Sequence, residues 1–303
     1  MTPAEAVYGF PPAALALAAA DAAQVSPLAP DGHAIEALAA GSLARMVVAA
    51  PAGTIERRYA LAHALRALRP HGELIALAPR DKGGARLRRE LEALGCAVNE
   101  TARRHYRVCM VRRPDDPVAL DVAIAAGGLQ IAPELGVWSQ PGVFSWDRLD
   151  PGSALLIECG LAFSGRGADL GCGVGVLARA VLASPRVSEL TLIDIDRRAV
   201  EAASRNVVDP RARFIRHDLR VPPHGVADLD FVITNPPFHD AGAEDRGLGR
   251  VFVAAAAAML RSGGVLRLVD NVALPYETTL AGAFSKVSLV MRAGGYKVLE
   301  ARR

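Results

Sequence analysis

Short apolar runs alternate with longer segments of helical periodicity from about residue 165 to the C-terminus. Parallel strands need a crossover of helical length between them, so this alternation predicts an α/β fold with a doubly wound, mostly parallel sheet. The expected strands are 167–170, 190–194, 213–216, 229–234, 265–269, 287–291 and 296–301. The expected helices include 175–183, 197–206, 249–260 and 276–283. Ligands of such sheets bind beyond the carboxyl ends of the strands, so the residues there are candidates for a functional site.

A chain of 303 residues favours two domains, because single hydrophobic cores rarely grow beyond ~250–300 residues. The sequence Pro114-Asp115-Asp116-Pro117 marks the expected boundary and gives domains over residues 1–116 and 117–303. The first domain is expected to be a smaller α/β domain whose Ala-rich first forty residues are helical. Its other expected elements are strands 43–49, 73–78 and 106–111 and helices 56–68 and 85–94.

The two domains share an internal repeat. Residues 68–74 (LRPHGEL) resemble residues 260–266 (LRSGGVL), and 106–108 (YRV) resemble 296–298 (YKV), at separations of 192 and 190 residues. The first domain therefore resembles the back half of the second, without its glycine-rich loop or its Asn-Pro-Pro sequence. We interpret it as a degenerate and shorter duplicate, with chance similarity between two α/β domains as the alternative.

Composition and cysteine spacing exclude several classes of protein. The net charge is +3, which permits a nucleic-acid partner without requiring one. The four cysteines are scattered without a CxxC pair, which argues against a zinc site and against a disulfide framework. The apolar stretch 10–20 is too short to span a bilayer and lacks the flanks of a signal peptide. We therefore expect a cytoplasmic monomer with no metal and no membrane attachment.

A glycine-rich loop follows the first strand of the larger domain. Residues 169–175 (DLGCGVG) place Gly171, Gly173 and Gly175 between that strand and a helix, where glycine lets the backbone approach a ligand closely. The spacing differs from the GxGxxG of dinucleotide-binding proteins. Asp169 before the loop would repel a phosphate but suits the ammonium of a methionine moiety. A loop of this kind also occurs without any ligand.

Acidic residues follow the next two strands. Asp194 is placed to accept hydrogen bonds from both ribose hydroxyls, whereas Asp196 is a candidate cap for the helix that follows it. Asp218 could accept a hydrogen bond from an adenine amino group, or be a solvated loop acid. Together with the glycine-rich loop, acids at successive strand ends describe a pocket for S-adenosylmethionine.

Asn235-Pro236-Pro237-Phe238 forms a rigid corner after strand 229–234, since two prolines restrict the backbone and end the strand. The Asn235 side-chain oxygen and the Pro236 carbonyl could hold the two hydrogens of an exocyclic base amine, while Phe238 stacks on the base. Catalysis of methyl transfer would then depend on positioning and electrostatics. A purely structural turn is the alternative.

These features resemble those of class I S-adenosylmethionine-dependent methyltransferases, most closely the ribosomal RNA guanine-N2 methyltransferases of the RsmC/RlmG type. The resemblance covers 142–303 closely and the first domain loosely, and its residues are 142–145 (GVFS), 149–153 (LDPGS), 169–175, 235–240 (NPPFHD), 274–276 (LPY) and 296–298. It implies a seven-stranded Rossmann-like methyltransferase sheet ending in an antiparallel hairpin. It also implies that Phe144 lines the cofactor pocket and that the methyltransferase-like N-terminal domain is inactive and helps to hold RNA. The apparent shortness of the first domain departs from this pattern.

Basic and polar residues near the corner are candidates for RNA contacts. They are Pro237, His239, Arg246 and Arg250, with Arg103 and Arg104 in the first domain. Arg side chains at such places position RNA through its phosphates, although a basic helix face is often simply solvated.

The leading hypothesis is methyl transfer from S-adenosylmethionine to the N2 amine of a guanine in ribosomal RNA or a ribosomal subunit. The same corner also serves adenine N6 and protein glutamine methylation, where Tyr often replaces Phe238. A non-catalytic RNA-binding or assembly factor that keeps the cofactor pocket is the hypothesis from another class.

Overall fold

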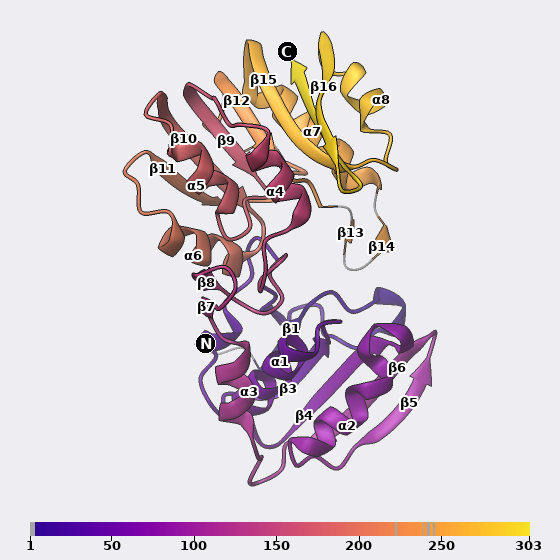
Figure 1. Cartoon of the computed structure of the whole chain (residues 1–303). Coiled ribbons are helices and arrows are strands. Elements are labelled where there is room, and N and C mark those ends of the chain that lie inside the picture. The colour runs from indigo at the N-terminus through magenta and orange to yellow at the C-terminus, as the bar shows by residue number, and fades with distance from the viewer. Residues whose placement is uncertain (1–3, 222, 238, 241–242, 245) are drawn as a thin grey trace. The chain divides into compact units, whose positions relative to one another are not determined.

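The computed structural model describes residues 4–221, 223–237, 239–240, 243–244 and 246–303. They form two compact units, Met1–Leu129 and Gln130–Arg303 (Figure 1). The sequence prediction ended the first domain at residue 116, but the structure keeps helix α3 (Leu120–Gly127) in the first unit. This helix packs against α1 (Thr54–Ala67), and Leu120 and Ile124 lie against the core of that unit.

The C-terminal unit contains the predicted seven-stranded sheet, in the order β11-β10-β9-β12-β15-β17-β16. The first five of these strands run parallel, while β17 pairs antiparallel with β15 and with β16. The strands are β9 (Gly165–Leu170), β10 (Val187–Asp194), β11 (Ala212–Arg216), β12 (Leu229–Thr234), β15 (Leu260–Asn271), β16 (Lys286–Ala293) and β17 (Tyr296–Arg302). The predicted fold of this unit is thus confirmed, including the antiparallel hairpin at one edge of the sheet.

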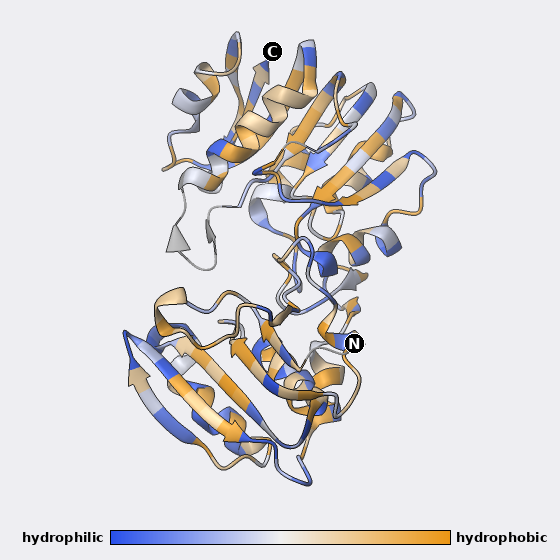
Figure 2. Cartoon of the chain, turned by 180° about the vertical axis from the view of Figure 1, so that it is seen from behind, coloured by the Kyte–Doolittle hydropathy of each residue, from blue (hydrophilic) through white to orange (hydrophobic). Residues whose placement is uncertain are grey.

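Helices cover both faces of this sheet. Residues of α4 (Pro151–Glu158), α5 (Val176–Leu182) and α6 (Arg197–Asn206) pack on one face. Residues of α7 (Arg246–Met259) and α8 (Tyr276–Ala281) pack on the other. Adjacent residues of a strand point to opposite faces, so Phe231 belongs to the first core and Val232 to the second. The strands are accordingly hydrophobic along much of their length (Figure 2).

Two short hairpins complete the described part of the C-terminal unit. One is formed by β7 (Gln130–Ala132) and β8 (Val137–Ser139), which pair antiparallel before α4. The other is formed by β13 (His239–Asp240) and β14 (Ala243–Glu244), between the Asn-Pro-Pro corner and α7.

The N-terminal unit has a six-stranded sheet in the order β2-β1-β3-β4-β6-β5. Its strands are β1 (Glu5–Tyr8), β2 (Ala23–Gln24), β3 (Leu43–Ala49), β4 (Leu68–Pro79), β5 (Asn99–Arg103) and β6 (Tyr106–Arg112). Besides α1 and α3 it contains α2 (Ala85–Ala93) and the short helical turns η1 (Ala13–Leu15), η2 (Ile35–Ala37) and η3 (Arg80–Gly84). The predicted α/β class of the smaller domain is confirmed.

Two expectations for the N-terminal unit were wrong. Its first forty residues contain β1, β2 and two 3-10 turns instead of longer helices, because prolines interrupt the segment and β1 is buried by pairing with β3. The unit is also more than the back half of its neighbour. Its six strands reproduce the order and directions of β10, β9, β12, β15, β17 and β16, and among residues 4–129 no strand takes the place of β11.

The described helices include none that is both long enough and apolar enough to cross a membrane.

Candidate active site

The parallel strands of the C-terminal sheet bring the predicted site residues to one edge. Strand β9 lies between β10 and β12, and Leu170 pairs with Ile193 on one side and Thr234 on the other. Because all three strands run in the same direction, their carboxyl ends place Asp169, Asp194 and Asn235 beside one another. These three residues are separated in sequence but gathered by the fold.

The glycine-rich loop has the backbone conformation that its sequence predicts. Gly171, Gly173 and Gly175 have φ of 67°, 53° and 85°, a region that other residues rarely adopt. The Gly173 amide donates a hydrogen bond of 2.9 Å to Asp194, which ties the loop to β10. A Cβ built on Gly173 would meet nothing within 4 Å, so the backbone there borders open space. That space admits a ligand against the loop.

Asp169 is fully buried and neither carboxylate oxygen has a hydrogen-bond partner among the described residues. Burial, and secondly the nearby Asp194 carboxylate, raise the pKa of Asp169 to about 8. An isolated buried carboxylate is costly unless a positive charge compensates it. Asp169 therefore fits a cationic group of a ligand held at this loop.

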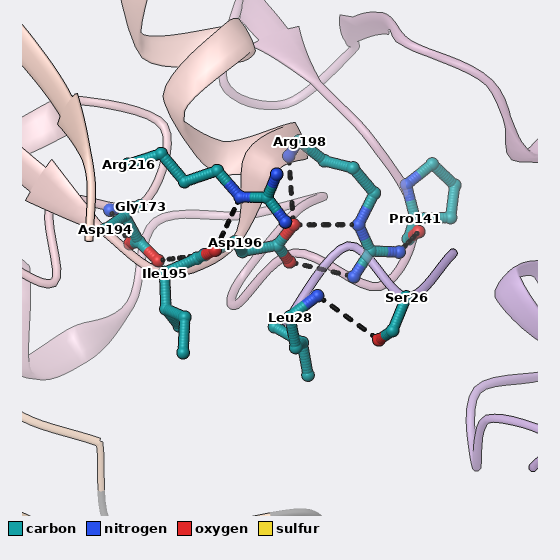
Figure 3. A network of polar contacts seen from close by, with 9 residues as sticks. All are labelled: Ser26, Leu28, Pro141, Gly173, Asp194, Ile195, Asp196, Arg198 and Arg216. Carbon is teal, nitrogen blue, oxygen red and sulfur yellow. Dashed lines mark hydrogen bonds and ion pairs between the residues drawn. The ribbon is translucent and has the colours of Figure 1, made fainter. Parts of the chain in front are cut away.

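Asp194 is the last residue of β10 and Asp196 lies two residues beyond it, but their environments differ. Asp194 accepts from the backbone amides of Gly173 and Asp196, each at 2.9 Å, and burial together with the Asp196 carboxylate raises its pKa to about 6. Each of its oxygens keeps a second lone pair that can accept from a ligand hydroxyl. Asp196 caps α6 as the sequence predicted, and its carboxylate is held by the buried Arg198 guanidinium (Figure 3).

Side-chain hydrogen bonds of Thr234 and Asn235 hold the Asn-Pro-Pro corner in place. The Thr234 hydroxyl donates to the Leu170 carbonyl at 2.7 Å, which joins the corner to the end of β9. The Asn235 amide nitrogen donates to Asp150 Oδ2 at 2.7 Å and to Ser153 Oγ at 2.9 Å. Asp150 also caps α4 by accepting from the Ser153 backbone amide at 2.8 Å.

The orientation of the Asn235 amide follows from these partners. An ionised carboxylate only accepts hydrogen bonds, so the amide group that faces Asp150 must be the NH₂ group. Its two hydrogens are both donated, to Asp150 and to Ser153, and Oδ1 is left as the acceptor of this side chain. The corner therefore presents an oxygen that can accept a hydrogen bond from an amine.

The remaining residues predicted near the corner differ in how far the structure describes them. Phe238 lies outside the described residues, as do the side chains of His239 and Arg246, which begin β13 and α7. Pro236 is buried and Pro237 partly buried. Arg250 is exposed on α7.

Two predicted cofactor residues are not oriented by the fold as tightly as Asp194. Phe144 is 61% exposed. Asp218 accepts from the Arg220 amide at 2.9 Å and faces the Arg220 guanidinium, within its own loop after β11. The roles of both residues stay predictions.

Arg103 and Arg104 belong to the N-terminal unit and are exposed. They lie at the turn between β5 and β6, where Arg104 has a φ of 47°. Their proposed role in holding RNA also stays a prediction.

No role was predicted for Asp150 and Ser153, although both belong to the segment 149–153. Asp-Pro-Gly-Ser is a recognisable helix start, with an acid at the N-cap and proline at the first helical position. That signal locates α4 but cannot reveal that Asp150 also contacts Asn235, which is 85 residues away.

A second charged group was missed at the end of β15. Lys297 is buried and donates to Glu277 and to the Leu274 carbonyl, each at 2.7 Å. Asp270 lies 4.0 Å from Lys297, and burial raises the pKa of Asp270 to about 7 against the influence of that lysine. These contacts anchor α8 to the sheet.

Within the described ranges, no cluster of three or more His, Cys, Asp or Glu side chains has the arrangement of a metal site.

Residues 134–300 match the family model described as the methyltransferase small domain. Two curated relatives, both ribosomal RNA small subunit methyltransferase C, come from Pseudomonas aeruginosa and Pseudomonas paraeruginosa. The first is 33% identical over 79% of this chain and 73% of the relative, and the second 34% identical over 87% and 80%. Alignments with the relatives from Shewanella loihica and Alcanivorax borkumensis cover only 50% and 54% of their lengths.

Among solved structures, the chain is similar to the Thermus thermophilus 16S rRNA N2 G1207 methyltransferase, RsmC, determined in complex with AdoMet and guanosine. The two share 31% sequence identity and superpose with a TM-score of 0.76, over 90% of this chain and 76% of the other. The similarity therefore extends over both units of the chain.

Proposed function

The chain belongs to the methyltransferase small-domain family, and we propose that its C-terminal unit transfers a methyl group from S-adenosylmethionine to the N2 amine of a guanine in ribosomal RNA. The observation that carries this proposal is the orientation of Asn235. Its amide presents an oxygen at the carboxyl edge of the sheet, beside the glycine-rich loop. Work on ribosomal RNA would place the protein in the cytoplasm.

The residues at the loop fit the cofactor. Asp169 would compensate the α-ammonium of the methionine moiety, Gly173 would let it approach the backbone, and Asp194 would accept from the ribose hydroxyls. When bound, S-adenosylmethionine supplies an electrophilic methyl group, so that the amine lone pair forms the N–C bond, the C–S electron pair stays on sulfur and one amine proton leaves to solvent. Phe144 and Asp218 are proposed to line the same pocket.

Asn235 would act on the amine. The N2 lone pair of guanine is delocalised into the ring, so the amine is a poor nucleophile while it stays planar. Acceptance of its two N–H groups by Asn235 Oδ1 and the Pro236 carbonyl favours a pyramidal nitrogen whose lone pair points away from both acceptors. The same acceptors stabilise the positive charge that develops on nitrogen, and they are already in place before the reaction.

A strong general base is unnecessary in this scheme, because the nitrogen becomes acidic once it carries the new methyl group. Asp169 and Asp194 are committed to the cofactor, and Asp150 is already bonded to Asn235 and Ser153. Positioning and electrostatic stabilisation would therefore supply the rate enhancement.

Ribosomal RNA as the substrate is supported by the names of the relatives and by the guanosine in the similar solved structure. We further propose that Arg250, Arg246, His239, Pro237 and Phe238 contact the target nucleotide or its neighbours. Arg103 and Arg104 would contact phosphates from the N-terminal unit, positioning RNA without reading its sequence.

The test is incubation of the protein with radiolabelled cofactor and small ribosomal subunits, or their free RNA, from a strain that lacks the gene. Label recovered as N2-methylguanosine after nuclease digestion is the expected result, and the variant Asn235→Ala is the matched control that should incorporate label far more slowly. Label in N6-methyladenosine or in protein glutamine would assign the corner to another amine. Cofactor binding with no label in RNA or protein would favour the non-catalytic RNA-binding role.

A further inference from the structure

Asn235 is restrained by a single pair of residues at the start of α4. Asp150 Oδ2 accepts from the Asn235 amide at 2.7 Å and from the Ser153 backbone amide at 2.8 Å. The Ser153 side-chain oxygen accepts the second Asn235 hydrogen at 2.9 Å. One carboxylate oxygen thus caps a helix and also holds the side chain at the predicted acceptor position.

On the basis of the proposed function, we infer that Asp150 and Ser153 are positioning residues that fix both the orientation and the polarity of the Asn235 amide during methyl transfer. If the amide turned over, its oxygen would face the Asp150 carboxylate and its NH₂ group would face the N–H groups of the target amine. One contact would then bring two acceptors together and the other two donors, so neither could form a hydrogen bond. The two acceptors on α4 therefore keep the amide in the reactive orientation.

The charge of Asp150 has a second effect. An amide that donates a hydrogen bond to a carboxylate carries more negative charge on its oxygen, because hydrogen bonds in a chain polarise one another. Asn235 Oδ1 becomes a stronger acceptor for the amine as a result. The Asp150 charge also acts through this chain on the nitrogen that becomes positive when the new bond forms.

A purely structural role for Asp150 as a helix cap predicts a different outcome. Asn is as good an N-cap as Asp, so Asp150→Asn preserves the cap while it removes the charge and one certain acceptor. If only the cap mattered, this variant would resemble the wild type. If Asp150 acts through Asn235, transfer slows while cofactor affinity and folding are retained.

Asp230 offers a matched control on the same strand. It follows the first residue of β12, at the end opposite to Asn235. Its carboxylate accepts from the Arg166 backbone amide at 2.8 Å and from Arg261 Nε at 2.8 Å. Asp230→Asn therefore makes the same chemical change in a comparable contact, remote from the corner.

The first experiment needs no RNA. The side-chain ¹⁵N–¹H₂ signals of Asn235 in the full-length protein are assigned by their loss in Asn235→Ala and then compared among wild type, Asp150→Asn and Asp230→Asn. We expect both amide protons to shift in Asp150→Asn and to stay in place in Asp230→Asn. Signals that do not move in Asp150→Asn would overturn the inference whatever the activity of the protein.

The second experiment is a double-mutant cycle under single-turnover conditions with the ribosomal substrate. Asp150→Asn should slow transfer roughly 10- to 100-fold, the value of a charge-assisted hydrogen bond, and Ser153→Ala about 3- to 10-fold. In the Asn235→Ala background, Asp150→Asn should cause no further loss, because its route of action is gone. An equal loss in both backgrounds, or a loss matched by Asp230→Asn, would refute the role.

The two experiments separate this inference from the proposed function. If the Asn235 signals respond to Asp150→Asn but the wild type forms no N2-methylguanosine, the restraint on Asn235 stands and the proposed substrate is wrong. If N2-methylguanosine forms but the cycle is additive, the proposed function stands and the positioning role is wrong.

Discussion

Replacing Asp169 by Asn should make the C-terminal unit progressively more stable than the wild type as the pH rises. The Asp169 carboxyl has a pKa of about 8 in the folded protein, against 3.8 in the absence of burial. Between these values the folded state holds a proton that the unfolded state has lost. The stability of the wild type therefore falls as pH increases through this window, by about 1.4 kcal/mol per pH unit.

Asn has nearly the same shape as the protonated acid but does not titrate. The difference in unfolding free energy between Asp169→Asn and wild type should accordingly grow by about 4 kcal/mol between pH 5 and pH 8, as an upper limit. Below about pH 4 this contribution disappears. Asp194, whose pKa is raised to about 6, titrates in both proteins, so comparing the two isolates the share of Asp169.

Urea unfolding followed by tryptophan fluorescence measures this difference. Trp138 and Trp146 are the two tryptophans of the chain, and both belong to the C-terminal unit, so their emission reports on that unit. A difference of about 4 kcal/mol would move the urea midpoint by roughly 1–4 M. A constant difference between pH 5 and pH 8, or a variant less stable than wild type at pH 8, would show that Asp169 is not a buried, uncompensated acid.

The same variant should lose cofactor affinity. A bound cation would return Asp169 to its charged form, so binding to the wild type releases a proton below about pH 8. Wild-type affinity should then rise with pH in this range, whereas the affinity of Asp169→Asn should be weaker and lack that slope. Isothermal titration with S-adenosylmethionine in two buffers of different ionisation enthalpy measures the proton release directly.

Three further predictions test other parts of the structure, and the second of them compares two glycines. Asn235→Ala should slow single-turnover methyl transfer at least ~100-fold. The cofactor dissociation constant, measured by titration calorimetry, should stay within a few-fold of the wild-type value. An equal loss of cofactor affinity would assign Asn235 to cofactor binding. Gly173→Ala should weaken cofactor binding about tenfold or more but cost only ~1–2 kcal/mol of stability, because its Cβ would enter open space. Gly167→Ala should destabilise the unit much more, because its Cβ would lie 2.2 Å from Phe231. Similar urea midpoints for the two variants would contradict this prediction. Arg57→Ala should destabilise the N-terminal unit by about 3–5 kcal/mol, because it leaves the buried Glu90 carboxylate without its main partner, and cofactor affinity should be unchanged. Hydrogen exchange of β3 and β4 measures the loss of stability, and unaltered protection of these strands would refute the prediction.

Much of the C-terminal sheet could be predicted from sequence because its strands carry their own local signal. The ranges 229–234 and 197–206 coincide with β12 and α6, where an apolar run or a helical period ends at a clear polar boundary. Element β1 could not be found in this way. Its four residues become a strand only because β2 and β3 pair with them on both sides, and that context is absent from the local sequence.

The site residues also divide into those that local sequence predicts and those that only the tertiary structure reveals. Asp169, Asp194 and Asn235 could be predicted because each lies at or just beyond the carboxyl end of a strand of a parallel sheet, and the fold brings these strand ends together. The contact between Asn235 and Asp150 could not, because it joins a strand end to a helix start through tertiary packing alone. The orientation of the amide, on which its proposed chemistry depends, is for that reason a property of the structure.

The register of the two sheets explains why we assign chemistry to one unit alone. Thr234 pairs with Leu170 as Val48 pairs with Tyr8, so Asn235 corresponds to Ala49 and Gly171 to Gly9. Ala49 has no side-chain amide oxygen that could accept a hydrogen bond from an amine.

Shortly after Ala49, the backbone carbonyls of Pro51 and Ala52 accept hydrogen bonds from the buried Arg57 guanidinium at 2.9 and 2.7 Å. Arg57 is also paired with Glu90. The corner of the N-terminal unit thus has no acceptor side chain at the position of Asn235, and its neighbouring carbonyls are bonded to Arg57. In the C-terminal unit the corresponding edge has Asn235, whose two amide N–H groups are bonded to the protein and whose oxygen we propose as the acceptor for the target amine. Both units share the order and directions of their strands, and we propose that a few side chains at the carboxyl edge of the sheet limit methyl transfer to the C-terminal unit.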